Sequence, residues 1–343
     1  MKFAGSVLLA ATLLLAGVMP VAAQDLDREL FNPILGSIVK VEAVTEAGGY
    51  SLGSAVPISA GHFVTSCHVT AKAVSISIQY QGLRWPVRGQ RADGKRDLCM
   101  LDVPKLSEVP AVRRSSSRNL KVGDGVVAIG YTFGAGLSTQ VGKVRALHAI
   151  DDGTVIQSAT YFNSGASGGG LFTLDGRLVG ILTFRLKGAE AYYFSVPADW
   201  IESEPGSDDS YRPIAPLGDA TPFWSQPADR LPYFMRAAAL QAREQWPDLL
   251  MLTQDWVAAE TSNPEPWFIR GEVFERLDRH NEAVTAFQRT TELNPQLALA
   301  WMKLGEAELR LQHLDTVQKV IKRLDALDAE LAAELRVRSG IKP

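Results

Sequence analysis

The sequence lacks the features that mark three large classes of protein. Lys and Arg form no cluster and the formal net charge is −3, so nothing provides the basic surface that a phosphate backbone requires. Beyond the N-terminal segment, no apolar run approaches the roughly 20 residues that span a bilayer. The five histidines and two cysteines show no zinc-like spacing. We therefore expect no metal or organic cofactor, no nucleic-acid partner and no stable membrane insertion of the mature chain.

The N-terminus has the composition of an export signal. Lys2 precedes the apolar run 7–19, and small residues follow that run up to Ala23. This order of charged, apolar and small residues predicts a signal peptide over residues 1–23, with cleavage after Ala23. The alternative is a retained membrane anchor, although the apolar run is short for one. We expect an exported protein, periplasmic or secreted, whose mature chain starts at Gln24.

Three regions of the mature chain differ in composition. Short runs rich in Val, Ile, Leu and Phe, separated by glycines, continue over residues 24–203 and predict an all-β domain. Residues 204–230 hold prolines among Gly, Ser and Asp and are typical of an extended linker. Residues 231–343 are rich in Ala, Leu, Glu, Arg and Gln, which favour helices. The predicted fold class is therefore a multidomain chain, β first and all-α afterwards.

The helical region contains a repeat. One copy matches the tetratricopeptide pattern at six positions, namely Trp267, Gly271, Phe274, Ala283, Phe287 and Pro295. Trp301 and Gly305 begin a weaker second copy at the expected spacing of about 34 residues. Because small residues allow paired helices to approach closely, this pattern predicts a tetratricopeptide-like array. A helical bundle with accidental spacing is the alternative.

The glycine-rich segment 163–172 surrounds Ser167 and suits a nucleophile. A serine hydroxyl attacks only when a base removes its proton, and the resulting oxyanion must meet N–H donors. Glycines let the main chain turn tightly enough to aim such donors, which here would be the N–H groups of Gly165 and Ser167. By itself the segment could also be a plain glycine-rich turn.

A second interpretation of this segment is the nucleophile elbow of the α/β-hydrolases, because Gly165, Ser167 and Gly169 match its Gly-x-Ser-x-Gly pattern. An elbow leads directly into a helix, whereas here two apolar runs follow, joined by the turn signal Asp175-Gly176. The candidates also run His, Asp, Ser along the chain, while the elbow order is Ser, acid, His. We therefore disfavour an esterase on that fold.

His68 is the candidate base, and Asp97 is the candidate acid that orients it. His68 directly follows a strand-like run, where a rigid element could fix its ring, and no other histidine has a matching context. Asp97 precedes the apolar run 98–101, and Asp102 at the far end of that run is the competing acid. We prefer Asp97 because of the two cysteines.

Cys67 adjoins His68, and Cys99 lies two residues after Asp97. A pair of cysteines in an exported chain is typically bridged, and a triad that joins His68 to Asp97 would draw these two together. We expect a Cys67–Cys99 disulfide that clamps the base to the acid. Two buried free thiols are the alternative.

Together these segments resemble the trypsin-like peptidases, most closely the bacterial Deg/HtrA-type branch. The matching motifs are Gly53-Ser54-Ala55, Thr65-Ser66-Cys67-His68-Val69, Asp97-Leu98-Cys99-Met100-Leu101 and Gly165-Ala166-Ser167-Gly168-Gly169-Gly170-Leu171. The resemblance covers roughly residues 35–200. It implies a double β-barrel with the active site between the barrels, and His68, Asp97 and Ser167 as the catalytic residues.

The resemblance also implies a specificity pocket lined by Tyr161, Phe162 and Thr183. No acid is among them, so we expect no preference for Lys or Arg and favour a small or medium apolar side chain at the cleaved bond. Ala166 replaces the usual Asn or Asp before the serine, which removes the salt bridge that activates many zymogens. Gly170 replaces a proline of the family motif. The helical region stands where many members of the branch carry a PDZ-like module.

The predicted function is that of a serine endopeptidase acting on proteins or peptides. The helical repeats would recruit a substrate or a protein partner, since such arrays present extended concave surfaces. The alternative is a catalytically inactive, protease-like scaffold that acts through its repeats. A missing triad member would have favoured the scaffold, but all three are present.

Overall fold

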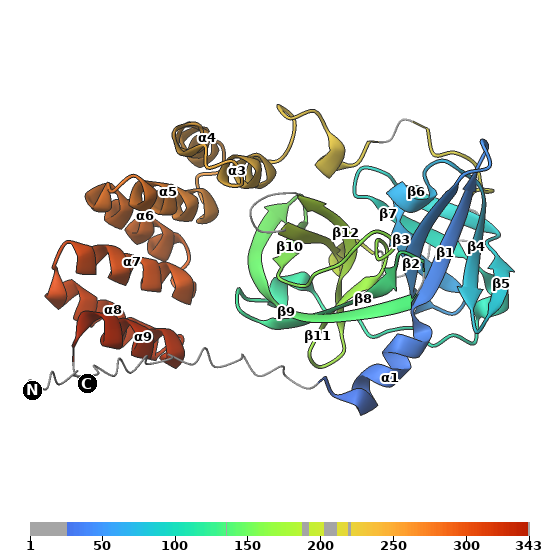
Figure 1. The fold of residues 1–343 in the computed structure, drawn as a ribbon, viewed down its shortest axis with the longest axis horizontal. Coiled ribbons are helices and arrows are strands. Elements are labelled where there is room, and N and C mark those ends of the chain that lie inside the picture. The colour runs from blue at the N-terminus through green and yellow to red at the C-terminus, as the bar shows by residue number, and fades with distance from the viewer. Residues whose placement is uncertain (1–25, 135, 187–191, 202–210, 219–220, 342–343) are drawn as a thin grey trace, which may run out of the picture.

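Two β-sheets form the first half of the molecule and helices form its last third (Figure 1). The structure is a computed structural model that describes residues 26–134, 136–186, 192–201, 211–218 and 221–341. The expected signal peptide, residues 1–23, lies outside the described residues. No helix within the described ranges is long and apolar enough to cross a membrane. The predicted order of β-sheets followed by helices is confirmed.

The first sheet has seven antiparallel strands in the order β5-β4-β1-β2-β3-β7-β6. A helix, α1 (Arg28–Ser37), leads into it, and the single-turn helix α2 (Cys67–Thr70) follows β3. Its strands are β1 (Val39–Thr45), β2 (Tyr50–Ser59), β3 (His62–Ser66), β4 (Ala73–Tyr80), β5 (Leu83–Pro86), β6 (Gly89–Asp93) and β7 (Leu98–Asp102). Fully buried side chains such as Val41, Phe63 and Leu101 fill its core, because apolar residues gain most from leaving water.

The second sheet closes into a barrel in the order β10-β13-β12-β11-β8-β9. Its strands are β8 (Gly125–Thr132), β9 (Gly136–Ile150), β10 (Gly153–Ser158), β11 (Gly170–Thr173), β12 (Leu178–Leu186) and β13 (Tyr192–Pro197). The turn between β11 and β12 contains Gly176 in the left-handed region, with φ of 76°, which glycine adopts without steric cost. This is the hairpin that Asp175-Gly176 predicted after the serine, and it excludes the helix that an elbow requires.

The two sheets are joined by buried polar contacts near Ser54 on β2. The Ser54 hydroxyl donates to the carbonyl of Gly165 over 2.9 Å and accepts from the N–H of Tyr131 over 2.8 Å. On β3, the Ser66 hydroxyl donates to the carbonyl of Leu182 over 3.1 Å. Because buried polar groups are costly unless paired, these contacts fix the position of one sheet relative to the other. They bring the end of β3 next to the segment that contains Ser167.

The proline-rich segment after the barrel lies along the first sheet. The backbones of Arg212 and Gln90 exchange two hydrogen bonds of 2.9 Å, and the N–H of Leu217 donates to the carbonyl of Ala71 over 2.8 Å. Within the described residues, short 3₁₀ turns connect elements of the two sheets and of this segment, namely η1 (Pro104–Leu106), η2 (Ser117–Asn119), η3 (Ala198–Trp200) and η5 (Phe223–Ser225). The sequence suggested an extended linker here, and the described part of this segment is hydrogen-bonded to the first sheet and to the residue that follows α2.

Successive helices pack in antiparallel order and form an arc beside the barrel (Figure 1). They are α3 (Tyr233–Gln241), α4 (Trp246–Ala259), α5 (Glu265–Arg276), α6 (His280–Leu293), α7 (Ala298–Arg310), α8 (Leu314–Asp325) and α9 (Ala329–Ser339). A Cβ at Gly271 would lie only 2.5 Å from the ring of Phe287, so the close approach of α5 and α6 requires glycine. The helical character is confirmed, whereas the tetratricopeptide assignment stays a prediction.

Candidate active site

His68 and Asp97 form a buried pair. The Nδ1 atom of His68 lies 2.7 Å from Oδ2 of Asp97, and the backbone N–H of His68 donates to Oδ1 over 2.8 Å. Asp97 is fully buried, whereas the His68 side chain keeps 29% of its surface exposed. An ionised carboxylate only accepts hydrogen bonds, so His68 carries its proton on Nδ1 and leaves Nε2 available as a base.

The backbone around this pair is strained and cross-linked. Asp97 has a positive φ of 59°, a conformation that Asp tolerates better than most residues, and its carbonyl accepts from the N–H of Cys67 over 3.1 Å. The structure joins Cys67 to Cys99 by a disulfide that spans 32 residues of sequence. On the chain-entropy model a loop of this length stabilises the fold by about 3–4 kcal/mol. The bridge ties the base to the strand that follows the acid.

The competing acid, Asp102, lies in a different environment. Its carboxylate pairs with Arg88 and lies 3.9 Å from Nε2 of His62. His62 and Asp102 are partners in the β3–β7 ladder, at the opposite end of both strands from His68 and Asp97. Of the two acids that the sequence offered, the structure brings Asp97 to His68.

The segment around Ser167 packs against β2 and β3. The carbonyl of Ser167 accepts from the N–H of Ser54 over 2.8 Å, and the N–H of Gly168 donates to Leu182 over 2.7 Å. Gly168 has φ of 85°, and a Cβ there would lie 2.2 Å from the Ser54 carbonyl oxygen, so only glycine fits. Among the described residues, the Ser167 hydroxyl donates to the carbonyl of Thr183 over 3.3 Å and makes no hydrogen bond to His68. Hydrogen bonds between nucleophile and base are often long before substrate binds.

The backbone N–H groups of Gly165 and Ser167 have no acceptor among the described residues. Gly165 has φ of 95°. The neighbouring N–H groups differ, since Ala166 donates to Asn163 over 3.0 Å and Gly169 donates to Ala166 over 2.8 Å. Free N–H groups beside a serine can stabilise an oxyanion.

Comparisons with known proteins show what the β-rich half of the chain is similar to. A family model described as a trypsin-like peptidase domain matches residues 53–181, which include the His68, Asp97 and Ser167 motifs. The chain contains a trypsin-like peptidase domain. The crystal structure of the Rv3671c protease from M. tuberculosis, active form, shares this fold, with a TM-score of 0.51, 21% identity and coverage of 62% of this chain and 100% of that one.

Two curated relatives are periplasmic serine endoproteases of Escherichia coli (strain K12). DegP is 32% identical over 164 residues, which cover 45% of this chain and 35% of the relative. DegQ, named as pH-dependent, is 34% identical over 182 residues, which cover 50% of this chain and 40% of the relative. The match thus spans less than half the length of either relative. The predicted resemblance to Deg-type peptidases is confirmed for the peptidase domain.

The three residues expected to line the specificity pocket differ in exposure. Thr183 is buried, and its hydroxyl donates to Ile181 over 2.8 Å. Phe162 is buried against Tyr193, with ring centroids 5.1 Å apart. Tyr161 is half-exposed, and its hydroxyl donates to Asn163 over 2.8 Å. Burial, and then the neighbouring Tyr161, raise the pKa of Tyr193, so the Tyr193 hydroxyl stays neutral at physiological pH.

Trp224, which the sequence did not single out, contacts the His68–Asp97 pair. Its indole Nε1–H donates to Oδ2 of Asp97 over 3.1 Å. Its ring meets the His68 ring edge-on, with centroids 5.4 Å apart and an angle of 88°. Trp224 belongs to η5, in the proline-rich segment that follows the barrel. The one available signal was the presence of Phe223 and Trp224 in an otherwise polar segment, since exposed linkers rarely contain adjacent aromatics.

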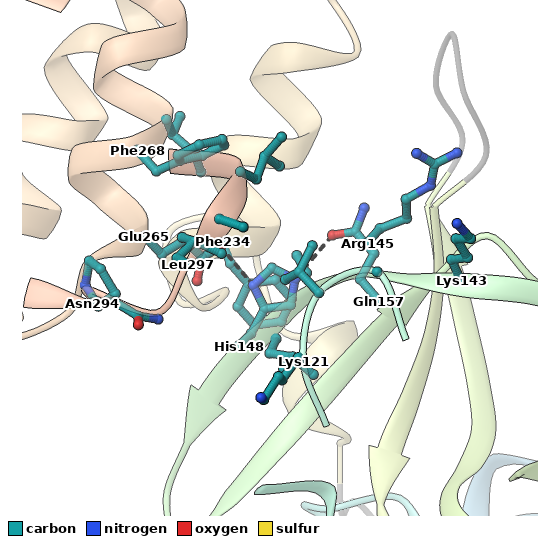
Figure 2. A pocket seen from close by; sticks show the side chains of 18 of the residues that line it. Lys121, Lys143, Arg145, His148, Gln157, Phe234, Glu265, Phe268, Asn294 and Leu297 are labelled. Atoms are coloured by element: carbon teal, nitrogen blue, oxygen red, sulfur yellow. Dashed lines mark hydrogen bonds and ion pairs between the residues drawn. The ribbon is translucent and has the colours of Figure 1, made fainter. Parts of the chain in front are cut away.

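A groove of about 1930 Å³ lies between the barrel and the helices (Figure 2). At its centre, both ring nitrogens of His148 on β9 lie within hydrogen-bond distance of a side chain. Nδ1 lies 2.7 Å from Oε1 of Glu265, and Nε2 lies 3.0 Å from Oε1 of Gln157. The His148 ring stacks on Phe234 of α3 with centroids 4.0 Å apart. This cluster, the His148 clasp (His148, Gln157, Phe234 and Glu265), attaches the helices to the barrel. No group of three or more metal-ligating side chains occurs within the described residues.

Proposed function

We propose that this chain is an exported, periplasmic or secreted, serine endopeptidase in which Ser167 is the nucleophile, His68 the general base and Asp97 the orienting acid. The observation that carries the proposal is the buried Asp97 carboxylate, which lies 2.7 Å from Nδ1 of His68. A carboxylate in this position fixes the ring and stabilises the imidazolium that forms during catalysis. The periplasmic location of the DegP and DegQ relatives supports export.

The residues of the site perform acyl transfer in two halves. Nε2 of His68 takes the proton of the Ser167 hydroxyl while its oxygen attacks the scissile carbonyl, and the same proton then passes to the leaving amine. The oxyanion of the tetrahedral intermediate accepts from the N–H groups of Gly165 and Ser167, and a single such donor contributes about 10²–10³ in rate. Water, deprotonated by His68, then hydrolyses the acyl-enzyme and restores the serine.

The preference at the cleaved bond follows from the pocket lining. Tyr161, Phe162 and Thr183 carry no charge that could pair with Lys or Arg, and the aromatic rings offer apolar contacts. We propose cleavage after small or medium apolar side chains. Ala166 gives a freshly cut N-terminus no carboxylate to pair with, so activation by that salt bridge is not part of this proposal.

The helical region is proposed to recruit a protein substrate or partner. In this division the peptidase domain covers residues 24–203, the proline-rich linker 204–230 and the repeats 231–343. The groove in Figure 2 supports the proposal because its walls differ in charge. Cationic side chains, Lys121, Lys143 and Arg145, face it from the barrel, and acidic side chains, among them Asp328, Glu330 and Glu334, line it from the helices. An extended polypeptide with charges of both signs would be complementary to such a groove.

The test compares the chain from Gln24 with its Ser167→Ala variant. Both are incubated with casein and with a fluorophosphonate probe that labels activated serines. Ser164→Ala is the matched control, because Ser164 is an exposed serine of the same segment. We expect labelling and cleavage to vanish in Ser167→Ala and to persist in Ser164→Ala. A folded wild-type protein that neither labels nor cleaves would contradict the proposal and favour a catalytically inactive scaffold.

A further inference from the structure

We propose that Trp224 is a positioning residue of the peptidase site, supplied by the segment that follows the barrel. Its indole N–H holds the Asp97 carboxylate in the orientation that His68 requires. This inference rests on the proposed function and adds to the triad a fourth side chain that the family motifs do not contain. Four observations support it: the groups that donate hydrogen bonds to Asp97, the stacking of the ring, the anchoring of the segment and the contrast with Trp200.

The hydrogen bonds of Asp97 show what Trp224 contributes. Oδ1 accepts from the backbone N–H of His68 over 2.8 Å, and Oδ2 accepts from Nδ1 of His68 over 2.7 Å and from Trp224 over 3.1 Å. Among the described residues, Trp224 is the only side chain besides His68 that donates to this carboxylate. Because Asp97 is fully buried, water does not readily replace a lost donor, and an under-satisfied buried carboxylate is costly.

The Trp224 ring is held between the two sheets. On one side it meets the His68 ring edge-on. On the other side it stacks on Phe184 of β12 with centroids 5.3 Å apart and an angle of 16°, and Phe184 stacks in turn on Phe194 of β13 over 4.7 Å. Such aromatic contacts favour a single geometry. The indole therefore stays directed at Asp97.

The segment that carries Trp224 is anchored on both sides of the pair. The N–H of Phe223 donates over 3.0 Å to the carbonyl of Lys95, two residues before Asp97. The N–H of Leu217 donates over 2.8 Å to the carbonyl of Ala71, directly after the helix that contains His68. Backbone hydrogen bonds at these two points fix the register of the segment. Since α3 begins at Tyr233, the helical region is connected to the active site through this segment.

The expected consequence concerns both rate and pH. Without the indole donor, the Asp97 carboxylate is less stabilised as an anion and attracts the proton of the imidazolium more strongly. More His68 is then protonated at a given pH, so the acid limb of the activity profile moves to higher pH. The looser carboxylate also orients the ring less well. We expect kcat to fall about 10-fold, a loss of about 1.4 kcal/mol in transition-state stabilisation, while KM stays within about two-fold.

The experiment replaces one indole at a time by a phenyl ring. Trp224→Phe keeps an aromatic ring and removes the N–H that donates to Asp97. Trp200→Phe is the matched control, because Trp200 is a buried tryptophan that contacts Phe223 of the same segment, but its indole nitrogen has no partner within the described residues. For both variants of the chain from Gln24, kcat, KM and the fluorophosphonate labelling rate are measured between pH 5 and 9. Circular dichroism establishes a temperature at which both are folded.

We expect Trp224→Phe to show the fall in kcat and the shifted acid limb, and Trp200→Phe to show neither. Equal profiles for Trp224→Phe and wild type, or equal losses in both variants, would overturn the role of Trp224 and leave the proposed function intact. An inactive wild type would overturn the proposed function itself and this proposal with it. If Trp224→Phe does not fold, Phe184→Leu is used instead, because it removes the ring on which Trp224 stacks. An acid limb at the same pH as in wild type would then overturn the proposal.

Discussion

At the scale of single residues, the His68–Asp97 pair depends on strand register. Thr65 and Ser66 of β3 pair with Cys99 and Leu98 of β7, so the residues just beyond these pairs, His68 and Asp97, meet at one end of the ladder. His68 lies just after the end of β3 and Asp97 just before the start of β7, and the apolar runs of these strands can be recognised in the sequence. This is why the sequence could name both. The choice between Asp97 and Asp102 depends on which end of β7 faces His68, and the structure places Asp102 beside Arg88 and His62.

One prediction separates the two acids. Asp97→Asn keeps the shape of the side chain but removes the charge that fixes the His68 tautomer, and a loss of about 10⁴ in kcat is expected on the triad mechanism. Asp102→Asn should leave kcat within about two-fold, because Asp102 lies at the far end of β7 from Asp97, beside Arg88 and His62. Steady-state cleavage of a peptide substrate measures both. Comparable losses in the two variants would contradict the role given to Asp97.

At the scale of elements, glycines decide how closely segments approach. Gly168 lets the Ser167 segment lie on β2, and Gly271 lets α5 lie on α6. Both glycines belong to patterns that can be recognised in the sequence, so the tight turn and the close-packed helices could be predicted. The docking of η5 could not, because composition describes a proline-rich segment as extended but does not say which surface it follows. The aromatic contacts of Phe223 and Trp224 decide that.

A second prediction concerns Glu272 on α5, which faces the groove. Burial raises the pKa of Glu272, and the positive charges of Lys303 and Arg276 oppose this only in part. The folded state therefore retains a proton that the unfolded chain releases near pH 4.3, so stability falls as pH rises through the raised value. We expect Glu272→Gln to have a higher Tm than wild type at pH 8, and the difference to disappear near pH 4.

The control for this prediction has the opposite sign. A hydrogen bond from Arg279 lowers the pKa of Glu282, so Glu282 contributes stability above its unfolded pKa and loses it as pH falls. Glu282→Gln should therefore have a lower Tm than wild type at pH 8 and an equal Tm at acid pH. Thermal unfolding from pH 4 to 8 measures both variants. A Tm difference for Glu272→Gln that does not change with pH would contradict the buried-carboxylate explanation.

At the scale of the whole molecule, two distant contacts hold the helices to the peptidase domain. The proline-rich segment is hydrogen-bonded along the first sheet, and the His148 clasp joins β9 and β10 to α3 and α5. The partners in the clasp are separated by up to 117 residues of sequence. Tyr161 and Tyr193 line the groove that these contacts form, so a chain bound in the groove would lie next to the proposed specificity pocket.

A third prediction tests the clasp. His148→Ala removes two hydrogen bonds and a ring stack, each worth about 0.5–1.5 kcal/mol, and should increase the population of open molecules at least 10-fold. Small-angle X-ray scattering should show a larger radius of gyration, and limited proteolysis should cut between the barrel and α3 more rapidly. His280→Ala is the control, because the hydrogen bond described for the His280 side chain is to Glu275, which also belongs to the helical region. Unchanged scattering for His148→Ala would show that the clasp is dispensable.

The sequence by itself determined the order of β-sheets and helices, the hairpin after Ser167 and the residues of the candidate triad. These features depend on neighbours in the chain: strand periodicity, turn residues and glycines with positive φ. Only the tertiary structure decided the contacts between remote segments. Ser54 meets Gly165 across 111 residues, and Trp224 meets Asp97 across 127. No local pattern encodes such contacts, because they form only when two complete sheets and the segment that follows them pack together and bury their polar groups in pairs.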